Sequence, residues 1–273
     1  MNQKLILLAA CVLAAAASAS AQTITETDGK YTISVGQTTM TVDATRGGKI
    51  LSYKLGEDEV LNQGRMPNSF GSTFWTSPQS EWNWPPVAEY DSKPFQAQIV
   101  GDKLVLTGEK SRFGYSVRKE FAAVPKKGAI AITYTIVNES DETRKVAPWA
   151  ITRVPNGGYL EFDAKAEDVT PLDLMKVSFD DNGAKLEIDV ANQNRKINVD
   201  GKGWLKFHDN GLVLTQKFPD IAPADAAPGE AEIQVYIDAR KSFVEIEAQG
   251  PYTELKPGEK LEWPVRWYLA AEE

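Results

Sequence analysis

Residues 128–138 read GAIAITYTIVN, and this stretch decides the fold class. Large apolar side chains alternate in it with smaller or polar ones, at Ile130, Ile132, Tyr134 and Ile136. A period of two residues is typical of a β-strand that buries one face. The glycine that opens the stretch is a turn signal, so we predict a strand that begins just after it.

The same alternation continues on both sides of this stretch. It recurs at Tyr31, Ile33 and Val35, at Ile233, Val235 and Ile237, and in the short aliphatic runs 104–106, 212–214 and 244–246. Turn dipeptides such as Asn182-Gly183 and Asn210-Gly211 separate these runs, as in antiparallel hairpins. A single open sheet with this many strands would curl or split. We therefore predict an all-β fold of two packed antiparallel sheets.

The first 21 residues differ from the rest of the chain. Lys4 precedes an apolar run, and Ala19-Ser20-Ala21 fits the small-x-small pattern of signal cleavage. We therefore expect a signal peptide over residues 1–21, one domain over 22–273, and a periplasmic or secreted protein. The alternative is lipidation at Cys11, which would leave an apolar core shorter than the ~7 residues expected, so we disfavour it.

Composition narrows the possible partners. The formal net charge is −8 with charges of both signs interspersed, which disfavours nucleic acid and anionic membranes and favours a neutral ligand. Cys11 is the only cysteine and His208 the only histidine, so we expect no disulfide, no metal centre and no cofactor. We also expect no membrane insertion after signal cleavage.

A long stretch from Asn62 to Pro94 lacks alternation and is rich in Trp, Pro, Ser and Asn. Trp75, Trp82 and Trp84 lie in it within ten residues, together with Gln79. Flat indole faces suit the C–H faces of a sugar ring, and the polar neighbours suit its hydroxyls. The stretch predicts a functional loop, although the same tryptophans would also serve as core packing.

Two predicted strands add further candidates. In residues 243–249, Glu245, Glu247 and Gln249 share the face opposite the core, where a carboxylate among aromatic rings can act as a general base. In residues 147–153, Trp149 and Arg153 share one face and can meet one ligand. The alternative for the first strand is a solvent-facing polar stripe, and for the second it is an arginine stacked on a tryptophan at the surface.

His208 precedes an Asn-Gly turn, which favours an exposed histidine at a strand end. No Gly-x-Ser-x-Gly motif accompanies it, so a serine hydrolase triad is not indicated.

The C-terminal sequence FVEIEAQGPYTELKPGEKLEWPVRWYL resembles the last strands of the galactose mutarotase-like superfamily. There a Glu-x-Gln strand precedes a Leu-x-Pro-Gly-Glu turn and a closing aromatic strand, matched here by 247–249, 255–259 and Trp267-Tyr268. The resemblance implies a β-supersandwich and gives Glu247 the position of the catalytic base. The strand APWAITR has no histidine where the family keeps its catalytic acid, so ordinary mutarotase activity is not implied. The segments FWTSPQSEWNWPP and APWAITR resemble a branch of secreted bacterial proteins with this fold.

These features lead to one main expectation and two alternatives. The main one is an exported protein that binds a neutral mono- or oligosaccharide in a Trp-rich cleft. The first alternative is a divergent sugar-active enzyme, an epimerase or a glycan-cleaving enzyme, with Glu247 as base and Glu81 or Glu245 as acid. The second is a protein-interaction module of the cell envelope, which would display its tryptophans on a flat surface.

Overall fold

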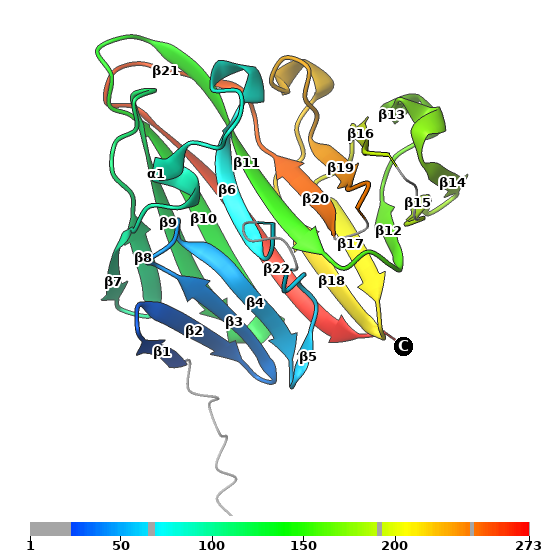
Figure 1. Cartoon of the computed structure of the whole chain (residues 1–273), viewed down its shortest axis with the longest axis horizontal. Helices are drawn as coiled ribbons and strands as arrows, with labels where there is room; N and C mark the ends of the chain where they lie inside the picture. The colour runs from blue at the N-terminus through cyan, green and yellow to red at the C-terminus, as the bar shows by residue number, and fades with distance from the viewer. Residues whose placement is uncertain (1–22, 65–68, 190–192, 241–242, 273) are drawn as a thin grey trace, which may run out of the picture.

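A computed structural model describes residues 23–64, 69–189, 193–240 and 243–272. The expected signal peptide and Cys11 lie outside these residues. The described chain forms two large antiparallel sheets (Figure 1). The predicted all-β architecture is therefore confirmed.

The first sheet has twelve strands, ten of which follow one path. Along this path they are β1 (Thr23–Thr27), β2 (Lys30–Val35), β3 (Thr38–Asp43), β4 (Lys49–Leu55), β6 (Ser72–Ser77), β11 (Arg144–Val154), β20 (Val244–Gln249), β19 (Ile233–Ile237), β16 (Arg195–Val199) and β13 (Val169–Thr170). Two short strands lie off the path, β5 (Asp58–Glu59) on β4 and β21 (Thr253–Leu255) on β11. In Figure 1 the cyan β6, green β11 and orange β20 run side by side across the centre.

The second sheet has ten strands. In order they are β14 (Lys176–Asp180), β15 (Gly183–Glu187), β12 (Tyr159–Phe162), β17 (Trp204–Asp209), β18 (Leu212–Lys217), β22 (Lys260–Ala271), β10 (Ala129–Asn138), β9 (Tyr115–Val124), β8 (Lys103–Thr107) and β7 (Gln96–Val100). The described helical segments are short: α1 (Ala88–Asp91) and the 3-10 turns η1 (Gln79–Glu81), η2 (Pro125–Lys127), η3 (Ala166–Asp168), η4 (Leu172–Leu174) and η5 (Pro223–Asp225). No helix in the described ranges is long and apolar enough to cross a membrane.

The core lies between the two sheets and follows the predicted alternation. Ile130, Ile132 and Ile136 on β10 are fully buried. Tyr134 on the same strand stacks on Phe74 of β6, with ring centroids 4.3 Å apart, and so joins the two sheets. Burying large apolar and aromatic side chains on one face of each sheet is what holds two such sheets together.

The stretch 62–94 is less irregular than predicted. It contains the whole of β6, whose six residues are all buried and which pairs along β11 from Ser72 to Ser77. A strand covered on both faces has no reason to alternate polar and apolar residues, so its period is invisible in the sequence. The prediction of a loop there was wrong for β6, and this places Trp75 on a strand.

Candidate functional site

Strand register brings the candidate side chains of the twelve-stranded sheet into rows. Trp149 on β11 lies opposite Trp75 on β6 and Gln249 on β20. Two residues further along β11, Ile151 lies opposite Glu247, and Arg153 follows opposite Glu245. Because side chains two residues apart share a face, all of these residues lie on the face opposite the core.

Part of this face forms a cavity of about 500 Å³, which we call the indole cavity. It is lined by Ser69, Trp75, Gln79, Trp84, Trp149, Arg153, Lys196, Tyr236, Asp238, Arg240, Phe243, Glu245 and Glu247. Seven predicted site residues are therefore brought together from β6, β11, β20 and the segment after β6. The volume is within the range of small-molecule sites, about 300–1,000 Å³.

The tryptophans have different roles in this cavity. Trp84 is 71% exposed and presents an open ring, whereas Trp75 and Trp149 are almost completely buried beneath it. Trp75 meets Trp84 and Trp149 edge to face, at centroid distances of 6.4 and 5.4 Å. Trp75 and Trp149 therefore pack against each other at the base of the cavity, and Trp84 presents an open ring at its edge.

Two predicted contact residues do not line the indole cavity. Trp82 is 4% exposed and donates its indole N–H to the carbonyl of Thr76 at 2.9 Å. Gln249 is fully buried, and its amide donates to Glu230 Oε2 at 3.0 Å. The structure therefore places both side chains outside the cavity lining, where their hydrogen bonds hold them among the residues packed around it.

Glu247 is a buried acid of the cavity. Its Oε2 accepts hydrogen bonds from the Trp149 indole at 2.9 Å and from Lys196 Nζ at 3.1 Å. Burial raises the pKa of Glu247 to about 7, against the opposing effect of Lys196. A carboxyl group that titrates near neutral pH can both accept and donate a proton.

Arg153 is the buried cation of the cavity. Its Nη2 pairs with Glu245 Oε1 at 2.8 Å, and its guanidinium lies 5.8 Å from the Trp75 ring centroid and 5.9 Å from that of Phe243. Among the described residues, neither its Nε nor its Nη1 has a hydrogen-bond partner. Buried donors of this kind are normally satisfied, so they indicate a place where a ligand or water completes the bonding.

Glu230 connects η1 to β19 and β20, and no sequence pattern indicated this role. Its Oε1 accepts from the Gln79 backbone N–H at 3.1 Å, and its Oε2 accepts from the Gln234 and Gln249 amides at 2.9 and 3.0 Å. Glu230, in the loop between β18 and β19, thus positions η1. Lys196, Tyr236, Asp238 and Arg240 were also missed. The alternation of Ile233, Val235 and Ile237 places Tyr236 on the opposite face, but only the strand order shows what that face meets.

Two other candidates lie away from the indole cavity. Glu81, considered above as a catalytic acid, faces Arg144 at 3.6 Å and does not line the cavity. His208 lies near the end of β17 in the other sheet, stacked on Tyr159, with its ring nitrogens 3.0 Å from Glu272 and 3.1 Å from Glu161. It is only 8% exposed, so the prediction of an exposed histidine was wrong: aromatic stacking and two carboxylates cover it.

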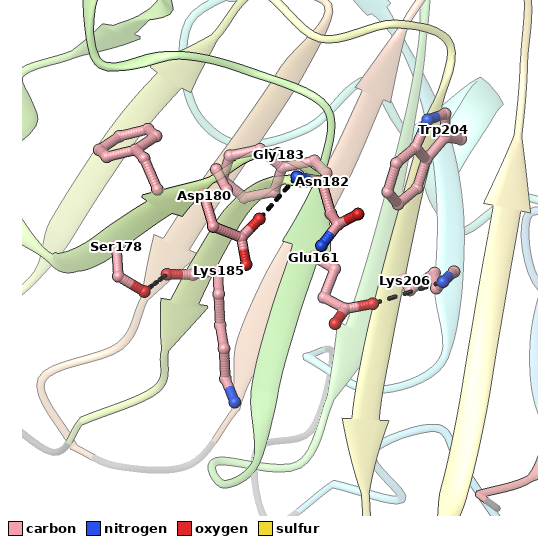
Figure 2. Close-up of a pocket in the computed structure, with 11 residues that line it drawn as sticks. Glu161, Ser178, Asp180, Asn182, Gly183, Lys185, Trp204 and Lys206 are labelled. Atoms are coloured by element: carbon pink, nitrogen blue, oxygen red, sulfur yellow. Dashed lines mark hydrogen bonds and ion pairs between the residues drawn. The ribbon is translucent and has the colours of Figure 1, made fainter.

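A second cavity of about 230 Å³ lies at the β14–β15–β12–β17 end of the ten-stranded sheet, and we call it the lateral groove. Figure 2 shows Trp204 on one side, Ser178 on the other, and Glu161 between them. Its contacts are the Lys206–Glu161 ion pair at 3.4 Å and the bond from the Asn182 N–H to Asp180 at 2.7 Å. These are ordinary contacts of exposed hairpins. In the described chain, no group of three or more His, Cys, Asp or Glu side chains is arranged to hold a metal ion.

Comparison with solved structures identifies the fold. A putative aldose 1-epimerase from Escherichia coli K12 aligns with a TM-score of 0.60 and 14% identity, over 89% of this chain and 99% of that one. A galactose mutarotase-like protein from Lactobacillus casei gives 0.61 and 12%, over 89% and 100%. A TPR-domain containing protein from Parabacteroides distasonis gives 0.62 and 17%, over 88% of this chain and 47% of that one.

These likenesses show that the chain has the galactose mutarotase-like fold, as its C-terminal sequence predicted. No protein-family model and no curated protein sequence matches the chain. One fold hosts many functions, so the function has to be argued from the site.

Proposed function

We propose that this protein binds a carbohydrate in the indole cavity. The observation that carries the proposal is the exposed ring of Trp84, which packs against the buried ring of Trp75 beside a set of charged and polar groups. An aromatic wall matches the apolar face of a pyranose, and convergent polar groups match its hydroxyls. Rigid packing lowers the entropy that is lost on binding.

The first test is a titration of a protein that consists of residues 22–273, monitored by intrinsic tryptophan fluorescence. The panel pairs each monosaccharide with its disaccharide: glucose and cellobiose, xylose and xylobiose, galacturonate and digalacturonate, N-acetylglucosamine and chitobiose. We expect a saturable change for at least one pair, which is lost in Trp84→Ala and kept in Trp204→Ala. A folded protein that responds to none of these sugars would contradict the proposal.

A sugar-active enzyme is the second candidate, because of the state of Glu247. Its carboxyl group titrates near neutral pH, and Lys196 and Tyr236 line the same cavity with protons of their own. A base and an acid are what the interconversion of anomers requires. One-dimensional NMR of freshly dissolved α-glucose or α-galactose, with Glu247→Gln as the control, tests this. If a sugar binds but its anomers interconvert no faster than in buffer, the enzyme hypothesis is wrong and only the binding function remains.

A protein-interaction module receives less support from this geometry. Three of the seven tryptophans line a cavity of about 500 Å³, and only one of these three is widely exposed. Flat partner surfaces instead display several apolar side chains together.

A further inference from the structure

A third cavity adjoins the indole cavity. It has a volume of about 340 Å³ and is formed by the segment around Thr170, by Asn198 on β16 and by the loop that carries Glu230. We call it the side cavity. Gln79 and Lys196 line both the side cavity and the indole cavity. The two cavities therefore meet at these two side chains.

The two cavities differ in character. Five of the thirteen residues that line the indole cavity are aromatic, whereas the residues that line the side cavity include no aromatic ring and are mostly neutral and polar, such as Asn198 and Thr170. Amides and hydroxyls of this kind both donate and accept hydrogen bonds, as sugar hydroxyls do. An aromatic subsite beside a polar one is what two neighbouring sugar rings require.

An unpartnered group lies at the side cavity. Gln234 is 1% exposed, and its Nε2 is bound to Glu230 at 2.9 Å, which fixes the direction of its amide. Among the described residues its Oε1 has no hydrogen-bond partner. A buried acceptor without a donor is costly in free energy, and a hydroxyl of a bound ligand would satisfy it.

We infer that the ligand is an oligosaccharide of at least two sugar units, with one ring in the indole cavity and the next in the side cavity. The linkage between the two rings then lies over the shared residues Gln79 and Lys196. Lys196 donates to Glu247 at 3.1 Å, so this arrangement places the linkage beside the Glu247 carboxyl group. The inference rests on the proposed function, since it extends the same site.

The experiment uses isothermal titration calorimetry on residues 22–273 and compares the affinity for each monosaccharide of the panel with the affinity for its disaccharide. We expect at least one disaccharide to bind tenfold or more tightly than its monosaccharide. In Asn198→Ala and in Thr170→Val, the affinity for that disaccharide should fall to that of the monosaccharide. The affinity for the monosaccharide itself should stay within twofold of the parent value.

The outcomes separate the two proposals. Equal affinity for both members of every pair, with binding lost in Trp84→Ala, would overturn the two-ring inference and leave the indole cavity as a monosaccharide site. A disaccharide that binds tightly but equally well in Asn198→Ala and Thr170→Val would also overturn it. If no sugar of either length binds, both the inference and the proposed function fail.

Discussion

The indole cavity and the lateral groove both place a tryptophan beside charged residues, yet they differ in how those charges are held. In the indole cavity, Arg153 and Glu247 are buried and are held by partners on other strands of the same sheet. In the lateral groove, Lys206 and Glu161 expose 39% and 35% of their side chains. Buried, interlocked charges fix the positions of a site, whereas exposed pairs mostly remain solvated. The network beneath the rings, more than the rings themselves, therefore distinguishes the two cavities.

The largest effect should come from breaking the ion pair of each cavity in turn. Arg153→Met leaves Glu245 without its partner in a largely buried position and should lower the free energy of unfolding by about 3 kcal/mol or more. Lys206→Met in the lateral groove should change it by less than about 1 kcal/mol. Urea denaturation measures both variants. Equal effects would remove the difference in burial on which the comparison rests.

The next effect concerns the pH dependence of stability. The pKa of Glu247 is raised from 4.5 to about 7 by burial, so between these values the folded protein holds a proton that the unfolded chain has lost. This contribution is fully present below pH 4.5 and is lost as the pH rises to about 7. It amounts to about 3 kcal/mol.

Glu247→Gln should remove that dependence. The difference in unfolding free energy between parent and variant should change by roughly this amount from pH 4.5 to 7.5, with the parent losing stability. Denaturation at five or six pH values measures it. A difference that stays constant with pH would show that Glu247 is not the perturbed group described here.

A smaller effect separates the tryptophans of the two cavities, Trp84 and Trp204. Trp84→Ala should weaken sugar binding about tenfold or more, because the ring is the open wall of the indole cavity. Trp204→Ala, the matched change in the lateral groove, should leave the affinity within twofold. Isothermal titration calorimetry with the sugar that responds in the panel measures both. The reverse order would make the lateral groove the binding site.

The smallest effect on sugar binding is expected for Trp82, which packs near the cavity but does not line it. Trp82→Phe removes the buried hydrogen bond to Thr76 and should lower the free energy of unfolding by about 1–2 kcal/mol. Sugar affinity should change less than threefold, because Trp82 does not line the cavity. If Trp82→Phe loses as much sugar affinity as Trp84→Ala, Trp82 contacts the sugar directly.

The fold was largely predictable because most strands bury only one face. The alternation on β10 and the C-terminal residues 243–271 gave the sheets and their family likeness. The strand β6 was hidden, because burial on both faces removes the period that reveals a strand.

The site was predictable in part for a related reason. Glu245 and Glu247 lie two residues apart on β20, and Trp149 and Arg153 lie four residues apart on β11, so local sequence places each pair on one face. Lys196 and Glu230 come from elements far along the chain, and only strand order and loop packing bring them to Glu247 and Gln79. The difference between Trp82 and Trp84 depends on loop geometry, which spacing alone does not specify.

The most direct test of the sugar site is the NMR spectrum of the seven indole N–H groups in protein labelled with ¹⁵N-tryptophan, assigned by single Trp→Phe variants. On titration with the sugar that binds best, the signals of Trp75, Trp84 and Trp149 should shift together and saturate. Those of Trp204, Trp263 and Trp267 should stay in place. A shift at Trp204 with none at Trp84, or no shift at any tryptophan, would contradict the assignment of the indole cavity as the carbohydrate site.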